Sequence, residues 1–585
     1  MAAELIYFLA GALALLLPGI WLARWIGAGQ SLLEYSTYGS TLGLALAVYL
    51  ASLISHFNLE WFYPIWAGVG IACLCGCWRT IRRTPLRRSP DSHWESWLWV
   101  ILVVVGVSRF AFVLPERLPD GWDPAFHMIL ARKIQLTQHA IWDWRPFAEA
   151  SLNYPTGSHL LIVILSGISR LPLPTVFKDL IPFLGVLTTA QVYLLGRRVT
   201  GSAQIGLYSA AAYGLWAWGG SIDYFRWGGL PNQLGMLLFL AVLSLWLDDG
   251  SPRRRMALMA LLYAAVVLVH HHVMVVSGAI LAVAMIGQII RPVSAASWKI
   301  LALALVAAAL LDSFYLVPYA LKASTLGSTR MIQLSERMLD LVELPASIGY
   351  LMCATAAIGL GLWIRGRFRC HPLAVWAVAT LAVMFIICEY VWPLLRRSRG
   401  LGTATIFTPS RFLSDANYFL VIFAAFPVAW AQKRWRLPTI RIIGLMLLGA
   451  LTQIGRWMDA PRGQDATPSE GFIQACDWIA RSTSPMTIVV NQNAAANTVA
   501  WAPYLTWRRC TYVPIPASEP VIDMNSLTNH VNGILSGQIP PDAPDMRIVR
   551  VTSQDKEHFG QVLWFDQSGD LVVQLWPPMT DSGKR

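Results

Sequence analysis

Two aspartates and a histidine stand close together in LPDGWDPAFHMILARKIQ, residues 118–135. A carboxylate such as Asp120 or Asp123 can act as a general base that takes a proton from a hydroxyl group. A helix would place His127 on the same face as Asp123, where it could orient the carboxylate or bind a ligand. The three side chains could also hold a divalent metal, although no fixed spacing demands it. Asp123 also precedes Pro124, a typical helix start, so a capping role is the alternative.

Further polar side chains lie between apolar runs later in the chain. Asp223 and Arg226 lie in SIDYFRWGGLPNQ, and Asp415 lies in PSRFLSDANYF. These charged side chains could contact a polar or anionic ligand. For Asp223 the alternative is that it is a solvated turn residue. Three histidines stand in a row at 270–272. Adjacent residues on a helix point about 100° apart, so we expect one of them, His271, to line a cavity and the other two to lie at the membrane interface.

The elements that position these residues are membrane spans. Of the 585 residues, 56% are hydrophobic and only 13% are charged, and the mean hydropathy is +0.50. A soluble domain carries about 25% charged residues. Apolar runs of about 18 residues recur, each long enough to cross a hydrocarbon core of about 30 Å. We therefore predict a polytopic α-helical membrane protein. The net charge of +12 lies mainly in short loops, which indicates orientation in a membrane rather than a nucleic-acid surface.

The basic loops define the internal face and divide the chain into about fourteen predicted spans. RTIRRTPLRR, residues 79–88, is the strongest internal signal, and the N-terminus is then expected outside. The predicted spans are 4–23, 38–56, 60–78, 97–114, 176–196, 202–220, 233–248, 256–270, 273–290, 299–319, 344–364, 372–392, 411–431 and 438–455.

The first external loop, residues 115–157, contains an amphipathic helix at 124–136. The apolar segment 158–170 follows, and the orientation of the neighbouring loops allows only one crossing between this loop and the internal GRR at 196–198. A segment this short more often lies at the interface or re-enters than crosses. We expect the helix at 124–136 to lie along the outer surface. Its apolar residues, turned toward lipid or protein, are Phe126, Ile129 and Leu130.

A second external loop, PLLRRSRGLGTATIFTPSRF at 393–412, is unusually basic for the outer side. Arg396, Arg397 and Arg411 could hold a lipid phosphate there, because guanidinium groups bind phosphate oxygens with good geometry. Ordinary contact with anionic headgroups is the alternative. Arg411 is the preferred phosphate ligand, since it stands at the mouth of a span near Asp415.

The C-terminal segment, residues 456–585, is too polar to span a membrane. SEGFIQACDWIARST reads as an amphipathic helix, and MTIVVNQ, RIVRV, QVLWF and LVVQLW read as strands. We predict a small external α/β domain, in which Cys476 and Cys510 could pair. The predicted organisation is therefore 1–95, extra N-terminal spans; 96–455, a transmembrane module; and 456–585, a soluble domain.

Several motifs in this order resemble the GT-C superfamily of integral-membrane glycosyltransferases. They are PDGWDPAFH in the first external loop, NYPTGSH before a juxtamembrane helix, LPLPTVFKDLIPFLGVLTTAQVYLLGRRVTG, SIDYFRWGGLP, and the C-terminal DWIARSTSP and WAPYLTWRRCTY. The resemblance covers roughly residues 95 to 585 and is greatest to poorly characterised bacterial and archaeal members. The likeness to aminoarabinose and O-mannosyl transferases is architectural. The WWDYG signature of oligosaccharyltransferases is absent from the sequence.

The resemblance implies transfer of a sugar from a polyprenyl-phosphate donor to a hydroxyl of a glycan, lipid or protein acceptor. It implies the plasma (inner) membrane, with the site and the C-terminal domain on the extracytoplasmic side. Asp123 matches the first-loop base best and Asp120 comes next. The residues implied in substrate binding are His127, Asp223, Arg226, His271, Arg396, Arg397, Arg411 and Asp415. The resemblance implies no particular cofactor, and a divalent metal stays open. The alternatives are a transporter or flippase for lipid-linked sugars, or a non-catalytic glycan-binding assembly protein.

Overall fold

The structure is a computed structural model. It describes residues 2–29, 31–83, 91–119, 122–147, 152, 154–290, 298–325, 344–398, 409–459, 468, 470–485, 487–491, 496–510, 548–552, 561–565 and 572–576. Asp120 lies outside the described residues. Arg226, Arg396 and Arg397 lie on described helices, but their side chains are not described.

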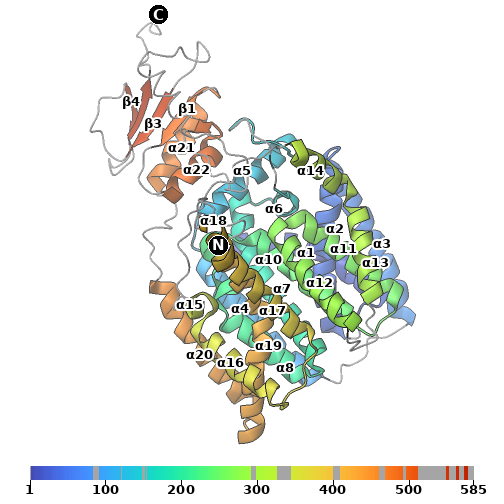
Figure 1. Cartoon of the computed structure of the whole chain (residues 1–585). Helices are drawn as coiled ribbons and strands as arrows, with labels where there is room; N and C mark the ends of the chain where they lie inside the picture. Colours follow the sequence, from blue (N-terminus) through green and yellow to red (C-terminus); the bar gives the residue numbers. More distant parts are fainter. Residues whose placement is uncertain are drawn as a thin grey trace, which may run out of the picture.

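A bundle of helices forms the membrane part of the protein (Figure 1). In chain order its helices are α1 (Ala2–Ile26), α2 (Leu32–Ile54), η1 (Leu59–Trp61), α3 (Phe62–Arg83), α4 (Ser92–Val113), α5 (Trp122–Thr137), α6 (Gly157–Ser169), α7 (Leu173–Thr200), α8 (Ala203–Leu215), η2 (Trp218–Ile222), α9 (Tyr224–Trp227), α10 (Leu230–Trp246), α11 (Pro252–Val269), α12 (His271–Ile290), α13 (Trp298–Leu311), α14 (Ser313–Thr325), α15 (Leu344–Ile348), α16 (Tyr350–Ile364), α17 (Leu373–Ile386), η3 (Ile387–Val391), α18 (Trp392–Ser398), α19 (Pro409–Trp435) and α20 (Thr439–Asp459).

The prediction of a polytopic helical membrane protein is confirmed, but the count of fourteen spans is not. All fourteen predicted segments overlap helices. Within the described residues, eight helices are long and apolar enough to cross a membrane, and a bent pair, α13 with α14, would make nine. The remaining apolar helices are shorter, because breaks such as the 70° bend between α13 and α14 divide several predicted spans.

Charged residues tie together the helix ends on the side opposite the soluble domain. Arg197 at the end of α7 pairs with Glu34 of α2 and with Asp91 beside α4, both at 2.8 Å. The neighbouring Arg198 pairs with Asp248, just after α10, at 2.6 Å. Four elements that are distant in sequence therefore meet on one face. The segment GRR at 196–198, which was predicted to be internal, lies on this face.

The two helices of the first long loop, α5 and α6, lie at the other end of the bundle, beside the soluble domain (Figure 1). Phe126, Ile129 and Leu130 of α5 are at most 1% exposed, so the apolar face of this helix packs on protein rather than lipid. The 13 residues of α6 extend about 20 Å at a rise of about 1.5 Å per residue, too short to cross. Instead of lying on the surface, α6 is almost wholly buried against α1, α2, α5 and α7.

The C-terminal part is an α/β domain with the predicted helix and strands. Its elements are α21 (Glu470–Ser482), β1 (Ile488–Asn491), α22 (Ala496–Thr506), β2 (Arg509–Cys510), β3 (Ile548–Thr552), β4 (Gln561–Phe565) and β5 (Val572–Trp576). The strand order is β2-β1-β3-β5-β4, with β1 parallel to β2 and β3, and β5 antiparallel to β3 and β4. Cys476 and Cys510 are buried free thiols, so the expected pairing is not observed.

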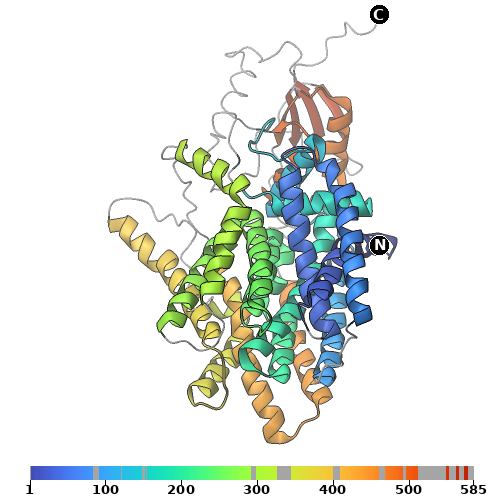
Figure 2. The same cartoon turned by 90° about the vertical axis from the view of Figure 1, so that its right-hand side faces the viewer.

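The soluble domain packs against α5 at one end of the bundle, as both views show (Figures 1 and 2). Arg132 of α5 donates to the backbone carbonyl of Tyr504, and its guanidinium lies 4.9 Å from the ring centroid of Trp507. The ring of Phe147 meets Trp507 edge-on at 4.9 Å. These contacts connect the soluble domain to the helix that begins with the candidate base.

Candidate functional site

Asp123 contacts a pair of buried histidines. It lies inside the first turn of α5, which begins at Trp122, so it does not occupy the position before the helix that a cap would take. Its carboxylate oxygen is 3.3 Å from Nε2 of His127, and its side chain remains 20% exposed. Nδ1 of His127 is 2.9 Å from Nε2 of His159 on α6. The structure therefore connects Asp123, His127 and His159 in one line, from a solvent-accessible carboxylate to the protein interior.

The contact between His127 and His159 couples the tautomers of the two rings, because only one of the two facing nitrogens can carry a proton. Burial, together with the neighbouring His127, lowers the pKa of His159 well below its usual range, so the ring is neutral. If His127 directs its Nε2–H toward Asp123, its Nδ1 must accept, and the proton between the two rings belongs to His159. His159 ends the motif NYPTGSH, but the sequence alone did not identify it as a site residue. Its pairing with His127 depends on α6 folding back against α5, which the sequence does not reveal.

The three consecutive histidines do not lie on one helix. The backbone is extended at His270 (φ −159°, ψ 120°), where α11 ends, and α12 begins at His271. Because of this break, the rings of His270 and His271 stack at 5.2 Å, and both lie within 6 Å of the Tyr154 ring. His271 is partly exposed, and its expected place in a cavity stays a prediction, whereas His270 and His272 are buried inside the protein rather than placed at its surface.

Asp415 is a buried acceptor rather than an open one. One carboxylate oxygen is 3.0 Å from Nε2 of His272, and the other accepts from Nδ2 of Asn232 at 3.1 Å. Asn232 also donates to the hydroxyl of Tyr224 at 2.7 Å. Asp415 therefore holds together α10, α12 and α19. Arg411, one turn earlier on α19, lies within electrostatic range of His270 and His271.

Asp223 is brought beside the start of α5 by an irregular segment. The backbone of η2 breaks at Gly219 and Gly220, and Gly220 has φ +71°. Asp223 follows directly and accepts from the hydroxyl of Ser414 at 3.5 Å. After α9, Gly228 (φ +78°) packs so tightly on Pro124 that a Cβ there would come within 2.5 Å of it. The segments that carry the two acids Asp123 and Asp223 are therefore in contact.

A buried arginine supports this irregular segment, and sequence reasoning missed it. Arg109 of α4 is 1% exposed. It donates to the hydroxyl of Ser221 and to the carbonyl of Gly214, and it lies 5.9 Å from the ring centroid of Tyr213. A Cβ on Gly185 would lie 2.0 Å from Nη1 of Arg109, so this glycine makes the room that the guanidinium occupies. A charge inside an apolar run is a functional signal in membrane proteins, and it could have identified Arg109.

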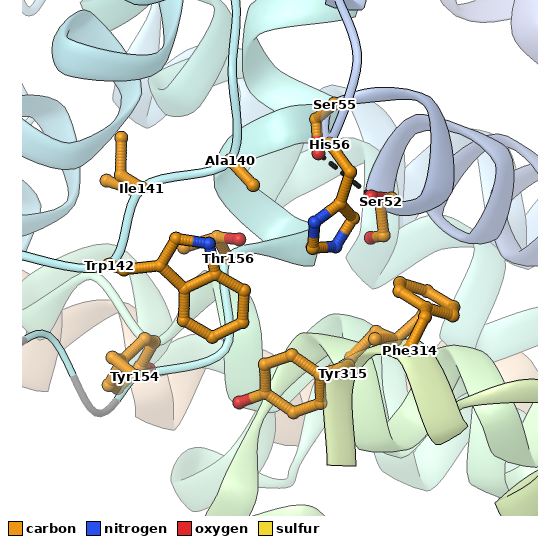
Figure 3. Close-up of a pocket in the computed structure, with 12 residues that line it drawn as sticks. Ser52, Ser55, His56, Ala140, Ile141, Trp142, Tyr154, Thr156, Phe314 and Tyr315 are labelled. Atoms are coloured by element: carbon orange, nitrogen blue, oxygen red, sulfur yellow. Dashed lines mark hydrogen bonds between the residues drawn. The ribbon is translucent and has the colours of Figure 1, made fainter. Parts of the chain in front are cut away.

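An aromatic pocket adjoins the histidines on the side of α2. Figure 3 shows the rings of His56, Trp142 and Tyr315 turned toward one another around it. Trp142 and Tyr315 are nearly parallel at 6.1 Å. Tyr154 lines this pocket and also contacts His127. The N-terminal helices therefore help to form the surroundings of the candidate site.

In the part of the chain that the structure describes, no group of three His, Cys, Asp or Glu residues could hold a metal ion. Asp120 lies outside that part, and the roles expected of Arg226, Arg396 and Arg397 stay predictions.

Comparison with known families is now informative. Residues 12–333, more than half of the chain, match the model of a family described as "Family of unknown function (DUF6541)". The chain belongs to this family. No curated protein matches it by sequence.

Solved structures identify the fold. The archaeal oligosaccharyltransferase AglB of Archaeoglobus fulgidus, in complex with an inhibitory peptide and a dolichol-phosphate, is 12% identical; the match covers 79% of this chain and 70% of AglB, with a TM-score of 0.50. ArnT of Cupriavidus metallidurans, bound to undecaprenyl phosphate, is 14% identical over 83% of this chain and 98% of ArnT, with a TM-score of 0.52. The mycobacterial arabinofuranosyltransferase AftD is 18% identical over 79% of this chain but only 35% of AftD, with a TM-score of 0.50. The predicted GT-C architecture is therefore confirmed at the level of the fold.

Proposed function

We propose that this protein transfers a sugar from a polyprenyl-phosphate donor to a hydroxyl group of an acceptor. The observation that carries the proposal is the Asp123 carboxylate, which is 20% exposed, contacts a buried histidine pair and begins a juxtamembrane helix beside a second external acid. The shared fold supports the same reaction class, because structures with this fold hold undecaprenyl phosphate and dolichol-phosphate.

In the proposed reaction, the acceptor oxygen attacks the anomeric carbon of the donor sugar. The bond from that carbon to the phosphate oxygen breaks, and the phosphate leaves with the electron pair. Asp123 takes the proton of the attacking hydroxyl. Phosphate is already a stable anion, so a general acid is dispensable. His127 orients the carboxylate of Asp123, and His159 holds His127 in the tautomer that does so.

The donor phosphate needs a cation, and Arg411 is the proposed one among the residues with described side chains. Its position at the outer end of α19, within electrostatic range of His270 and His271, supports this role. Arg226, Arg396 and Arg397 are the further proposed phosphate contacts. Asp415 is proposed to act indirectly, by holding His272, because both of its oxygens already accept hydrogen bonds.

The proposed orientation has the site and the soluble domain outside, in the plasma membrane. The ion pairs of Arg197 and Arg198 gather on the opposite side of the bundle, with the basic loops that mark a cytoplasmic face. The acceptor is proposed to be a glycan, a lipid or a protein that reaches this outer face.

The test is transfer by the purified full-length chain in membranes, with a panel of radiolabelled undecaprenyl-phosphate hexoses and pentoses. We expect Asp123→Asn to lower transfer at least about a hundredfold, within the range of a lost general base, while donor binding is retained. Asp143→Asn is the matched control, because Asp143 is an acid of the same loop that pairs with Lys133. Transfer that survives both Asp123→Asn and Asp120→Asn would refute the assignment of either aspartate as the general base. Donor flipping without transfer by the wild type would instead indicate a flippase.

A further inference from the structure

A second pocket lies where α6 turns into α7, and the proposed reaction does not use it. It is a wide, open depression lined by Arg132 and Gln135 of α5, Arg170 after α6, Leu173 of α7 and Tyr504 of α22. The pocket therefore joins the first external loop, the start of a candidate span and the soluble domain. Its lining contains two arginines and no acid.

The two arginines come from different elements. Arg132 donates to the Tyr504 carbonyl and lies against the rings of Tyr504 and Trp507, and these groups are uncharged. Arg170 has a left-handed backbone (φ 58°) at the end of α6. The turn beneath it is fixed, because Ser166 donates to the carbonyl of Leu171 at 2.6 Å.

The positive charges of Arg132 and Arg170 are not neutralised by an acid: among the described residues, neither side chain has an ion pair within 4.0 Å. Asp477 of α21 is within electrostatic range of Arg132. Its own ion pair, however, is with Arg481 at 3.9 Å. Two guanidinium groups facing one pocket without an acid suit a phosphate.

The position of the pocket indicates which phosphate. Leu173 lines it and is also the first residue of α7, a candidate span from Leu173 to Thr200. The pocket is therefore at the membrane boundary, where lipid headgroups lie. Leu171 and Pro172 also line it, so an acyl chain can continue from the phosphate along apolar side chains.

We propose that this pocket binds the phosphate of an anionic lipid in the leaflet that faces the soluble domain, between Arg132 and Arg170. It shares α5 and α6 with the proposed catalytic site, but Asp123, His127 and His159 are not among its lining residues. Arg132 also contacts Tyr504, so a bound lipid would connect the soluble domain to the membrane surface. The inference does not depend on glycosyl transfer.

The experiment uses the full-length chain in nanodiscs of phosphatidylcholine and phosphatidylglycerol, and native mass spectrometry counts the lipids that stay bound. We expect the wild type to retain phosphatidylglycerol preferentially. Arg170→Gln should lower this preference about threefold to fivefold, the effect of a solvent-exposed ion pair. Arg170 is exposed, so the variant should fold normally. Arg145→Gln, an exposed arginine of the same external loop outside the pocket, should leave the preference unchanged.

Equal retention by the wild type and Arg170→Gln would overturn the proposal, as would an equal loss in Arg145→Gln. Soluble glycerol phosphate is the second probe. Failure of millimolar glycerol phosphate to displace the lipid would support a lipid headgroup, and full displacement would overturn that assignment in favour of a soluble phosphate. The readout is bound lipid, so a protein that transfers no sugar can still pass or fail this test.

Discussion

Replacement of His159 tests whether the buried histidine pair positions the Asp123 carboxylate. His159→Leu removes the hydrogen bond to Nδ1 of His127, which is 2.9 Å long and fully buried. A buried nitrogen left without a partner costs about 1–3 kcal/mol. If most of this loss appears as disorder of the Asp123–His127 contact, transfer should fall about tenfold to a hundredfold.

The matched variant is His159→Gln, because the amide nitrogen of glutamine can take the place of Nε2 and donate to His127. We expect it to recover transfer to within about threefold of the wild type. This corresponds to a change in activation free energy well under about 1.4 kcal/mol, the value for a tenfold change in rate. His139→Leu removes an exposed histidine of the same loop and should change little. The initial rate of sugar transfer at saturating donor is the measurement.

The pH dependence of stability reports on the protonation of His159. Burial and His127 lower the pKa of His159, so the folded chain binds fewer protons there than the unfolded chain. Wild-type stability should therefore fall as the pH drops below about 6.5, and this part of the fall should vanish in His159→Gln. Equal transfer rates in all three variants, or a fall in stability at low pH that persists in His159→Gln, would refute the reasoning.

Two further substitutions test the surroundings of the site. Gly185→Ala places a methyl group 2.0 Å from Nη1 of Arg109, so we expect a loss of about 1–3 kcal/mol, read as a lower unfolding temperature in detergent. Gly361→Ala, whose Cβ would meet nothing within 4 Å, is the control, and equal unfolding temperatures would contradict the packing argument. Arg117→Ala removes an ion pair with Glu470 whose side chains are 60% and 57% exposed. It should change stability by less than about 1 kcal/mol, and a larger loss would show that this pair matters more to domain attachment than its exposure implies.

The sequence predicted the architecture well because apolar runs, basic loops and strand patterns are local signals. The juxtamembrane helix at 124–136 and the helix and strands after 470 lie close to their expected places. The contact between Asp123 and His127 was predicted for the same reason, since their spacing on one helix determines it, whereas the choice of Asp123 as the base came from the family resemblance.

The rest of the site depends on contacts that are distant in sequence. His159 meets His127 only because α6 is buried beside α5. The three histidines at 270–272 converge because the backbone leaves the helix at His270, which a helical period cannot reveal. Arg109 lies inside an apolar run and was overlooked. Its hydrogen-bond partner Ser221, which helps to explain how the charge is tolerated there, is 112 positions away in the sequence.

The contact between α5 and the soluble domain has a consequence for modularity. Composition separates the chain near residue 455, but the contacts cross that boundary: Arg132 and Phe147 of the first external loop depend on Tyr504 and Trp507. The helix that carries Asp123 therefore contacts both the membrane part and the C-terminal domain. Exchange of the C-terminal domain between relatives would therefore change the contacts of α5. Chimaeras should take the 115–157 loop and the C-terminal domain from the same parent.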